Sequence, residues 1–165
     1  MKNIIFLRHA KSSWSNPGLR DHDRPLNKRG NRDAPIMASQ LKKMYPIIDQ
    51  VFVSTSQRTR ETIQYFIEEY GENLKNISFE ASLYHGSPND YQDMLIQASP
   101  ESETILMVGH NPGITYVAND CSSNSFIDNI PTCGIFILQS NEEHWHEVNL
   151  TSCSRLLFIY PKMYV

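Results

Sequence analysis

The segment Asn3–His9, with the sequence NIIFLRH, decides the fold of this chain. Its first five residues form a short, apolar, β-rich run, which is typical of a buried strand. A basic pair, Arg8-His9, follows directly where that strand would end. The segment therefore predicts a central strand of a sheet, with two polar side chains at its carboxyl end.

Outward from this segment, helical and extended patterns alternate through the first two thirds of the chain. Asn27 is a plausible helix N-cap, and Gly71 a natural helix stop. Pro35 falls inside the first helical pattern, so that helix is expected either to kink there or to begin later. The expected helices are 27–45, 56–70 and 89–98, and the expected strands between them are 50–53, 77–80 and 104–108.

Three more strands are expected in the last third, at 134–139, 145–150 and 156–160. Strand–helix alternation favours a mostly parallel sheet with right-handed crossovers and helices on both faces. The late strands would add an antiparallel edge. We therefore expect one domain over residues 1–165, an α/β fold built as a three-layer α/β/α sandwich.

Composition limits the classes of function. The chain has 165 residues, 40% of them apolar, and a formal net charge of -3, which gives no general attraction to nucleic acid or to anionic membranes. The three cysteines, Cys121, Cys133 and Cys153, are isolated and odd in number, which argues against a disulfide scaffold and for a reducing compartment. The N-terminal apolar run is too short for a signal peptide, and no stretch is long enough to span a bilayer. A cytoplasmic protein is expected.

Polar clusters follow three of the expected strands. They are Arg8-His9, Ser54–Arg58 and Gly109-His110. Because ligands of open α/β sheets bind at the carboxyl ends of the strands, clusters distant in sequence are expected to share one rim. Either histidine or arginine alone would more often be a structural or surface residue, but their convergence favours a site.

The side chains of this rim suit a phosphoryl group. The guanidinium groups of Arg8 and Arg58 match phosphate oxygens and stay charged. A histidine can act as a nucleophile when one ring nitrogen is unprotonated, and a nearby backbone carbonyl could hold the required tautomer. Phosphoryl transfer mainly needs alignment and charge stabilisation, which this rim offers.

The sequence resembles a known family. Leu7–Trp14 (LRHAKSSW) is similar to the Arg-His-Gly/Ala signature of the histidine phosphatase superfamily, which includes phosphoglycerate mutases, and more narrowly to that of the SixA-type phosphohistidine phosphatases. Asp21–Gly30, Ser54–Thr62 and Val108–Gly113 resemble later blocks of the same group. Pro131–Gly134 and the closing Pro161-Lys162 do so as well, so the resemblance spans nearly the whole chain.

The resemblance implies a phosphatase that works through a phosphohistidine intermediate without metal or organic cofactor. By match to the motifs, His9 is the nucleophile. Arg8 and Arg58 bind the phosphoryl oxygens, and His110 contacts the same group and stabilises the transferring charge.

Two departures from the wider superfamily bear on the substrate. Ala10 replaces a common glycine, as it often does in this subgroup, and no clear equivalent of the general-acid carboxylate is present near Glu80–His85. An imidazole leaves more easily than a sugar alkoxide. The implied substrate is therefore phosphohistidine on a protein, such as a histidine phosphotransfer protein, with a small phosphate ester as the alternative.

Other residues near the motifs have open roles. Arg24 either reaches the phosphate or lies on the surface, and His85 is a candidate proton donor. The Asp21–Asp23 run is more readily a polar loop, with Asp23 and Arg24 bonded locally, than a metal cluster. Trp14 either lines the pocket mouth or packs ordinarily, and Ser54 and Thr62 are expected to support the site.

Three rival functions remain at this stage. The first is a small-molecule phosphatase on the same scaffold, with a mutase less favoured. The second is a catalytically silent module that binds phosphate or phosphoproteins, against which the intact set of His9, Arg8, Arg58 and His110 argues. The third is a metal-dependent hydrolase built on the histidines.

Overall fold

A single six-stranded sheet runs through the protein, which a computed structural model describes over residues 1–165. The strand order is β3-β2-β4-β1-β5-β6. Strands β3 (Ile77–Glu80), β2 (Gln50–Ser54), β4 (Thr104–Gly109) and β1 (Lys2–Arg8) are parallel neighbours. The predicted α/β fold with a mostly parallel sheet is confirmed.

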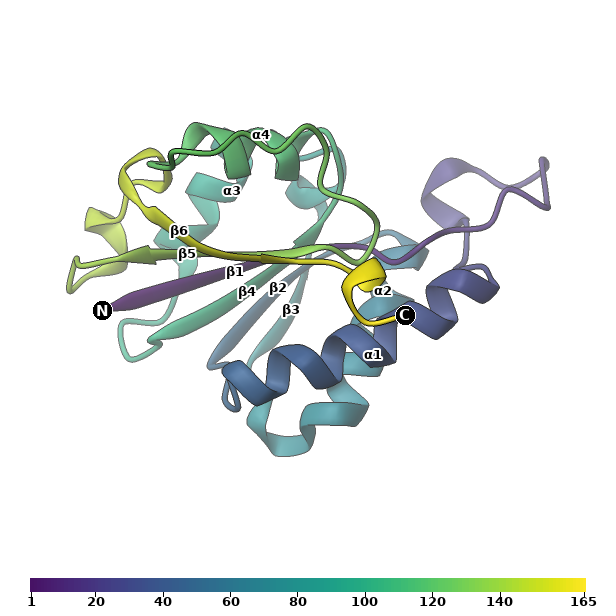
Figure 1. The fold of residues 1–165 in the computed structure, drawn as a ribbon, viewed down its shortest axis with the longest axis horizontal. Coiled ribbons are helices and arrows are strands. Elements are labelled where there is room, and N and C mark those ends of the chain that lie inside the picture. The colour runs from purple at the N-terminus through teal and green to yellow at the C-terminus, as the bar shows by residue number, and fades with distance from the viewer.

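Helices cover both faces of this sheet, which gives the predicted three layers (Figure 1). Helices α1 (Lys28–Met44) and α2 (Gln57–Tyr70) lie on one face, and α3 (Pro88–Met94) and α4 (Gly113–Asp120) lie on the other. Each face encloses its own apolar cluster, of 21 buried residues under α1 and α2 and of 22 under α3 and α4. The sheet is therefore buried on both sides.

The antiparallel edge is also confirmed, with one correction. Strand β5 (Ile135–Ser140) pairs antiparallel with β1, and β6 (Ser154–Ile159) pairs antiparallel with β5. The strand expected at 145–150 is wrong, because residues Trp145–Glu147 and Leu150–Ser152 form 3-10 turns.

Local side-chain contacts explain that error. The Trp145 indole N–H donates to the Ser102 carbonyl, 2.9 Å away, and the Asn149 side chain accepts from the Thr151 N–H. The buried residues of this stretch are Trp145, Val148 and Leu150, a spacing without strict alternation. Backbone groups bonded within the turn are not available to a sheet.

The helices begin where the capping residues predict. The Asn27 side chain accepts from the Gly30 N–H at 2.9 Å, and the helix continues through Pro35. The Ser56 hydroxyl caps α2 by accepting from the Thr59 N–H. The third helix is shorter than expected, since 89–98 divides into α3 and a 3-10 turn at Leu95–Gln97.

The topology brings three predicted polar clusters to one edge. Strands β2, β4 and β1 are consecutive in the sheet, and they are parallel, so their carboxyl ends meet. In register, Arg8 pairs with Gly109, and Val53 pairs with Val108. Residues separated by about one hundred positions in the chain therefore become neighbours.

Gly30 lets the first turn of α1 approach the loop that follows β1. A Cβ atom at this position would lie 2.2 Å from the Lys11 carbonyl oxygen. That oxygen already accepts from the Asn27 N–H at 2.9 Å. The close contact ties the loop after His9 to the start of α1.

We predict that Gly30→Ala destabilises the protein, although alanine is normally favoured over glycine in a helix by about 1 kcal/mol. Overpacking costs about 1–3 kcal/mol, and a contact of 2.2 Å with a backbone oxygen belongs to the upper part of that range. We therefore expect a net loss of about 1–2 kcal/mol in the free energy of unfolding, measured by urea denaturation. The exposed Lys43→Ala on the same helix is the control and should change it by less than about 0.5 kcal/mol. A Gly30→Ala variant as stable as the wild type would contradict the close-contact argument.

Candidate active site

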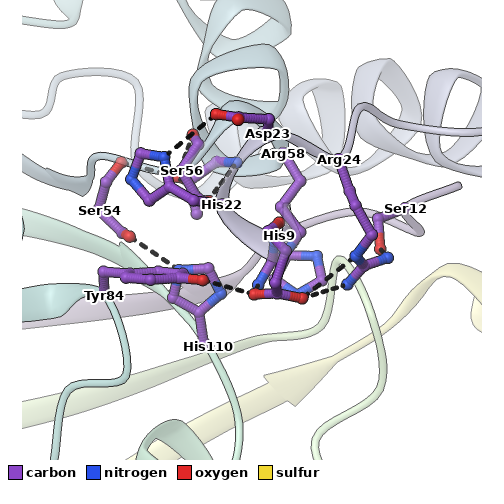
Figure 2. A network of polar contacts seen from close by, with 12 residues as sticks. His9, Ser12, His22, Asp23, Arg24, Ser54, Ser56, Arg58, Tyr84 and His110 are labelled. Atoms are coloured by element: carbon purple, nitrogen blue, oxygen red, sulfur yellow. Dashed lines mark hydrogen bonds and ion pairs between the residues drawn. The ribbon is translucent and has the colours of Figure 1, made fainter. Parts of the chain in front are cut away.

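The predicted side chains surround one cavity of about 380 Å³ at the carboxyl edge of the sheet. The predicted set all line it, namely Arg8, His9, Arg58, His110, Arg24 and His85. The other lining residues are Lys11, Ser12, Trp14, Asp21, Asn111 and Thr132. Figure 2 shows His9, Arg58, Arg24 and His110 gathered from different segments of the chain.

His9 is held in one orientation and one tautomer. Its Nδ1 lies 2.7 Å from the Ala10 carbonyl oxygen, and a carbonyl only accepts, so Nδ1 carries the proton in the neutral ring. The other nitrogen, Nε2, then keeps its lone pair. The side chain is 6% exposed, and burial together with the charges of Arg58, Arg8 and Arg24 lowers the pKa of His9 to about 3. The ring is therefore neutral at physiological pH.

Two guanidinium groups flank His9 and are fixed by backbone carbonyls. Arg8 Nη1 donates to the Ile130 carbonyl at 2.9 Å, and Arg58 Nη1 donates to the Asp21 carbonyl at 2.7 Å. Burial, then the nearby Arg58 charge, lowers the pKa of Arg8, yet a guanidinium starts so high that it stays charged. Two positive charges are thus held beside a neutral imidazole.

His110 lies across from His9, with 5.2 Å between ring centroids. Its Nε2 lies 2.7 Å from the Ser54 hydroxyl. This contact links the end of β2 to the end of β4. Burial, followed by the charges of neighbouring His9 and Arg58, lowers the pKa of His110 to about 2. Ser54 therefore supports the site, as expected from its position.

Three buried nitrogen atoms of these residues have no hydrogen-bond partner in the protein. They are Arg8 Nε, Arg58 Nε and His110 Nδ1. An unpartnered buried polar group costs about 1–3 kcal/mol. All three atoms belong to residues that line the cavity together with His9.

The sequence analysis missed the role of Asp21. Its carboxylate accepts from Arg58 Nη2 at 3.0 Å, from Arg24 Nε at 3.2 Å and from the Tyr84 hydroxyl at 2.6 Å. Although desolvation opposes it, the Tyr84 and Arg58 hydrogen bonds and the arginine charges hold the pKa of Asp21 far below its usual range. The i,i+3 spacing of Asp21 and Arg24 was the available signal.

The two uncertain residues differ in their surroundings. Arg24 is 7% exposed and not a surface residue, and its donors already bind Asp21, the Ser12 hydroxyl and the Ser13 carbonyl. Figure 2 shows its guanidinium directed toward Ser12. His85 is exposed at the cavity wall, with its ring centroid 4.0 Å from that of Tyr84 and the two rings tilted by 40°, so it stays a candidate proton donor.

A further layer of contacts holds the loop after β1 in place. The Thr62 hydroxyl accepts from the Ala10 N–H at 3.0 Å and donates to the Arg58 carbonyl at 2.7 Å. Asn111 donates to the Ile130 carbonyl at 3.0 Å, the same oxygen that Arg8 uses. The three strand ends are therefore linked to one another by side chains.

Asp23 and Arg24 form the local hydrogen bonds expected of a polar loop. Asp23 pairs with Arg20 at 3.0 Å and lies 3.6 Å from His22, and Arg24 pairs with Asp21 at 3.1 Å. No group of three or more His, Cys, Asp or Glu side chains in the structure is placed to hold a metal ion. Asp21 faces the arginines instead.

Comparison with known families agrees with this geometry. Residues 4–86 match the model of the histidine phosphatase superfamily, branch 1. The chain belongs to the histidine phosphatase superfamily. A chloroplastic protein of Arabidopsis thaliana without assigned function is 32% identical over 154 residues, which cover 88% of this chain and 70% of that protein. A Mycobacterium tuberculosis protein, also without assigned function, is 30% identical over 94% of this chain and all of its own length.

Solved structures place the chain with the SixA type of this superfamily. A SixA protein from Agrobacterium tumefaciens superposes with a TM-score of 0.80 at 25% identity, covering 97% of this chain and 99% of its own. A mycobacterial glucosyl-3-phosphoglycerate phosphatase shares the fold at a TM-score of 0.67 and 14% identity, covering 94% and 97% of the two chains. As for membranes, none of the helices has the length and apolar character needed to cross a bilayer.

The buried histidines predict how stability depends on pH. His9 and His110 have folded-state pKa values of about 3 and about 2, below the usual 6.5, so the unfolded chain binds their protons first as pH falls. Stability should therefore drop from pH 7 to pH 5, by about 2 kcal/mol for each histidine at 1.36 kcal/mol per pH unit. Asp21 does not contribute in this window, because it is ionised in both states above about pH 5.

The measurement is the free energy of unfolding at pH 7 and pH 5 for the wild type and His9→Gln. We expect the variant to lose about 2 kcal/mol less than the wild type over this interval. Equal losses in the two proteins would show that His9 is not held neutral by its surroundings. The variant His144→Gln, at an exposed position, should behave as the wild type does.

Proposed function

We propose that this protein is a phosphatase that transfers a phosphoryl group to His9 and then to water, and that its substrate is phosphohistidine in a protein. The observation that carries the reaction type is the fixed Nε2 lone pair of His9 among three unpartnered buried donors. Membership of the superfamily supports the same chemistry.

In the first step, His9 Nε2 attacks phosphorus while the bond from phosphorus to the leaving imidazole breaks. The electron pair stays on the departing nitrogen, and the imidazole leaves as a neutral molecule because its far nitrogen carries a proton. Arg8 Nε, Arg58 Nε and His110 Nδ1 supply donors for the three equatorial oxygens of the transferring group. For His110 this requires Ser54 to donate its proton to Nε2, so that Nδ1 carries the ring proton. The Ala10 carbonyl stabilises the positive imidazole that forms on His9.

In the second step, a water molecule attacks the phosphorus of phosphorylated His9. The P–N bond breaks, its electron pair returns to Nε2, and the proton of the water is released with inorganic phosphate. The atoms and electrons of the two proposed steps balance without a cofactor. Because the surroundings favour neutral His9, its return as a leaving group at physiological pH is favoured as well.

The substrate class follows from the acids that the cavity offers. Asp21 is its one carboxyl group, and the hydrogen bonds from Tyr84 and Arg58 keep it ionised. An ionised carboxylate cannot protonate an alkoxide, whereas an imidazole leaves without strong acid help. This supports phosphohistidine over a sugar or glycerate ester, with His85 as the candidate donor of any proton required.

We predict that a labelled phosphodonor such as phosphoramidate forms an acid-labile, base-stable adduct with the protein. The adduct should be absent from His9→Ala, in which the attacking nitrogen is missing, and present in His144→Ala, an exposed histidine at the opposite end of β5. The measurement is rapid quench followed by intact mass or radiolabel counting. Label on His9→Ala would refute the nucleophile, and no label on the wild type would favour the silent binding module.

A substrate panel separates the two phosphatase hypotheses. We expect kcat/KM for a phosphohistidine-bearing protein to exceed that for 3-phosphoglycerate by at least about a hundredfold, because loss of general acid catalysis costs about 10²–10⁴ with a poor leaving group. Added chelator should leave both rates unchanged. Faster turnover of a glycerate or sugar ester would instead support the small-molecule phosphatase.

A further inference from the structure

Trp14 is the one apolar side chain that lines the catalytic cavity. The remaining lining residues are charged or polar, and the deepest of them, such as His9 and Arg58, are suited to the phosphoryl group itself. Trp14 is 71% exposed, although tryptophan is usually largely buried. An apolar ring at the mouth of a polar cavity can contact only the part of a substrate that lies outside the phosphoryl group.

The indole is held firmly despite its exposure. The Arg24 guanidinium carbon lies 3.6 Å from the centroid of the indole, so one ring face rests on a cation. Arg24 is itself fixed by Asp21 and by the Ser12 hydroxyl, at 2.7 Å from Nη1. The loop that carries Trp14 is also tied down next to this residue, because the Ser13 N–H donates to the Pro25 carbonyl at 2.8 Å. The rest of the indole surface is presented to solvent in a fixed position.

The geometry of the proposed reaction places the leaving group near the exposed face of the Trp14 indole. In-line displacement places the leaving group opposite the attacking Nε2 of His9. His9 is 6% exposed and Trp14 is 71% exposed, and both line the cavity, so a leaving group on the open side of the cavity lies toward Trp14. A planar leaving group emerging there meets a preordered aromatic face.

We propose that Trp14 recognises the leaving group by stacking against the imidazole ring of a phosphohistidine. The inference rests on the phosphatase function proposed above and adds a specificity residue to it. The guanidinium on one face of the indole and the imidazole on the other would form a stack of three planar groups. Such a contact selects a planar aromatic leaving group over an aliphatic alcohol or ammonia.

Two P–N substrates that differ only in the ring test this. Phosphoimidazole carries the ring, and phosphoramidate has the same bond type without it. An aromatic contact of ordinary strength corresponds to about a threefold to tenfold change. We expect Trp14→Ala to raise KM for phosphoimidazole by about that factor while changing phosphoramidate turnover less than twofold, and Trp14→Phe to restore most of the loss.

A binding measurement provides a readout without chemistry. In His9→Ala, phosphoimidazole should quench indole fluorescence, and the quench should be lost in the double variant with Trp14→Phe. Trp145 remains as an internal reference, since it is 3% exposed and bonded to the Ser102 carbonyl.

The outcomes are distinguishable. An equal loss of activity on both substrates in Trp14→Ala would mean that the ring only supports Arg24, which overturns the inference. No loss on either substrate overturns it too. Wild type that turns over phosphoramidate or esters but not phosphoimidazole would reject the proposed substrate class, and the inference with it.

Discussion

The burial of positive charge at the junction of three strand ends is the constraint on which this site depends. Arg58 and Arg24 are both more than nine-tenths buried, and Arg8 is partly so. Buried charges are tolerated only when they are paired and hydrogen-bonded. Backbone carbonyls of Ile130 and Asp21 and the Asp21 carboxylate meet part of that need. All three arginines line one cavity, where the proposed phosphoryl anion would offset their charge.

The same positive charges determine the protonation of the histidines. Burial is the largest cause of the low pKa of His9, and the three arginine charges add to it. A nucleophilic nitrogen must be unprotonated, so in the proposed reaction the arginines that bind the phosphoryl oxygens would also keep the attacking nitrogen of His9 available.

Sequence reasoning predicted the parts of the fold that depend on local pattern and on the order of the elements. The apolar run before Arg8, the cap at Asn27 and the helix start near Ser56 defined elements that the structure contains. It failed at Trp145, where a buried indole and side-chain-capped turns replace a strand. It also missed Asp21. The Asp21 carboxylate lies in a loop and accepts hydrogen bonds from Arg24 and Arg58, and the local sequence gives only a weak indication of these contacts.

Asp21 also changes how Arg58 can meet a phosphoryl group. Both terminal nitrogens of Arg58 are engaged by Asp21, one by its carbonyl and one by its carboxylate. Each terminal nitrogen carries a second N–H, and Nε has no partner in the protein, so the guanidinium keeps donors that are not engaged by Asp21. The benefit of the Asp21 contacts is an orientation fixed before substrate arrives, since a preorganised donor needs no rearrangement during the reaction. Asp21 therefore acts on the proposed reaction by positioning Arg58, through one hydrogen bond to its carbonyl and one to its carboxylate.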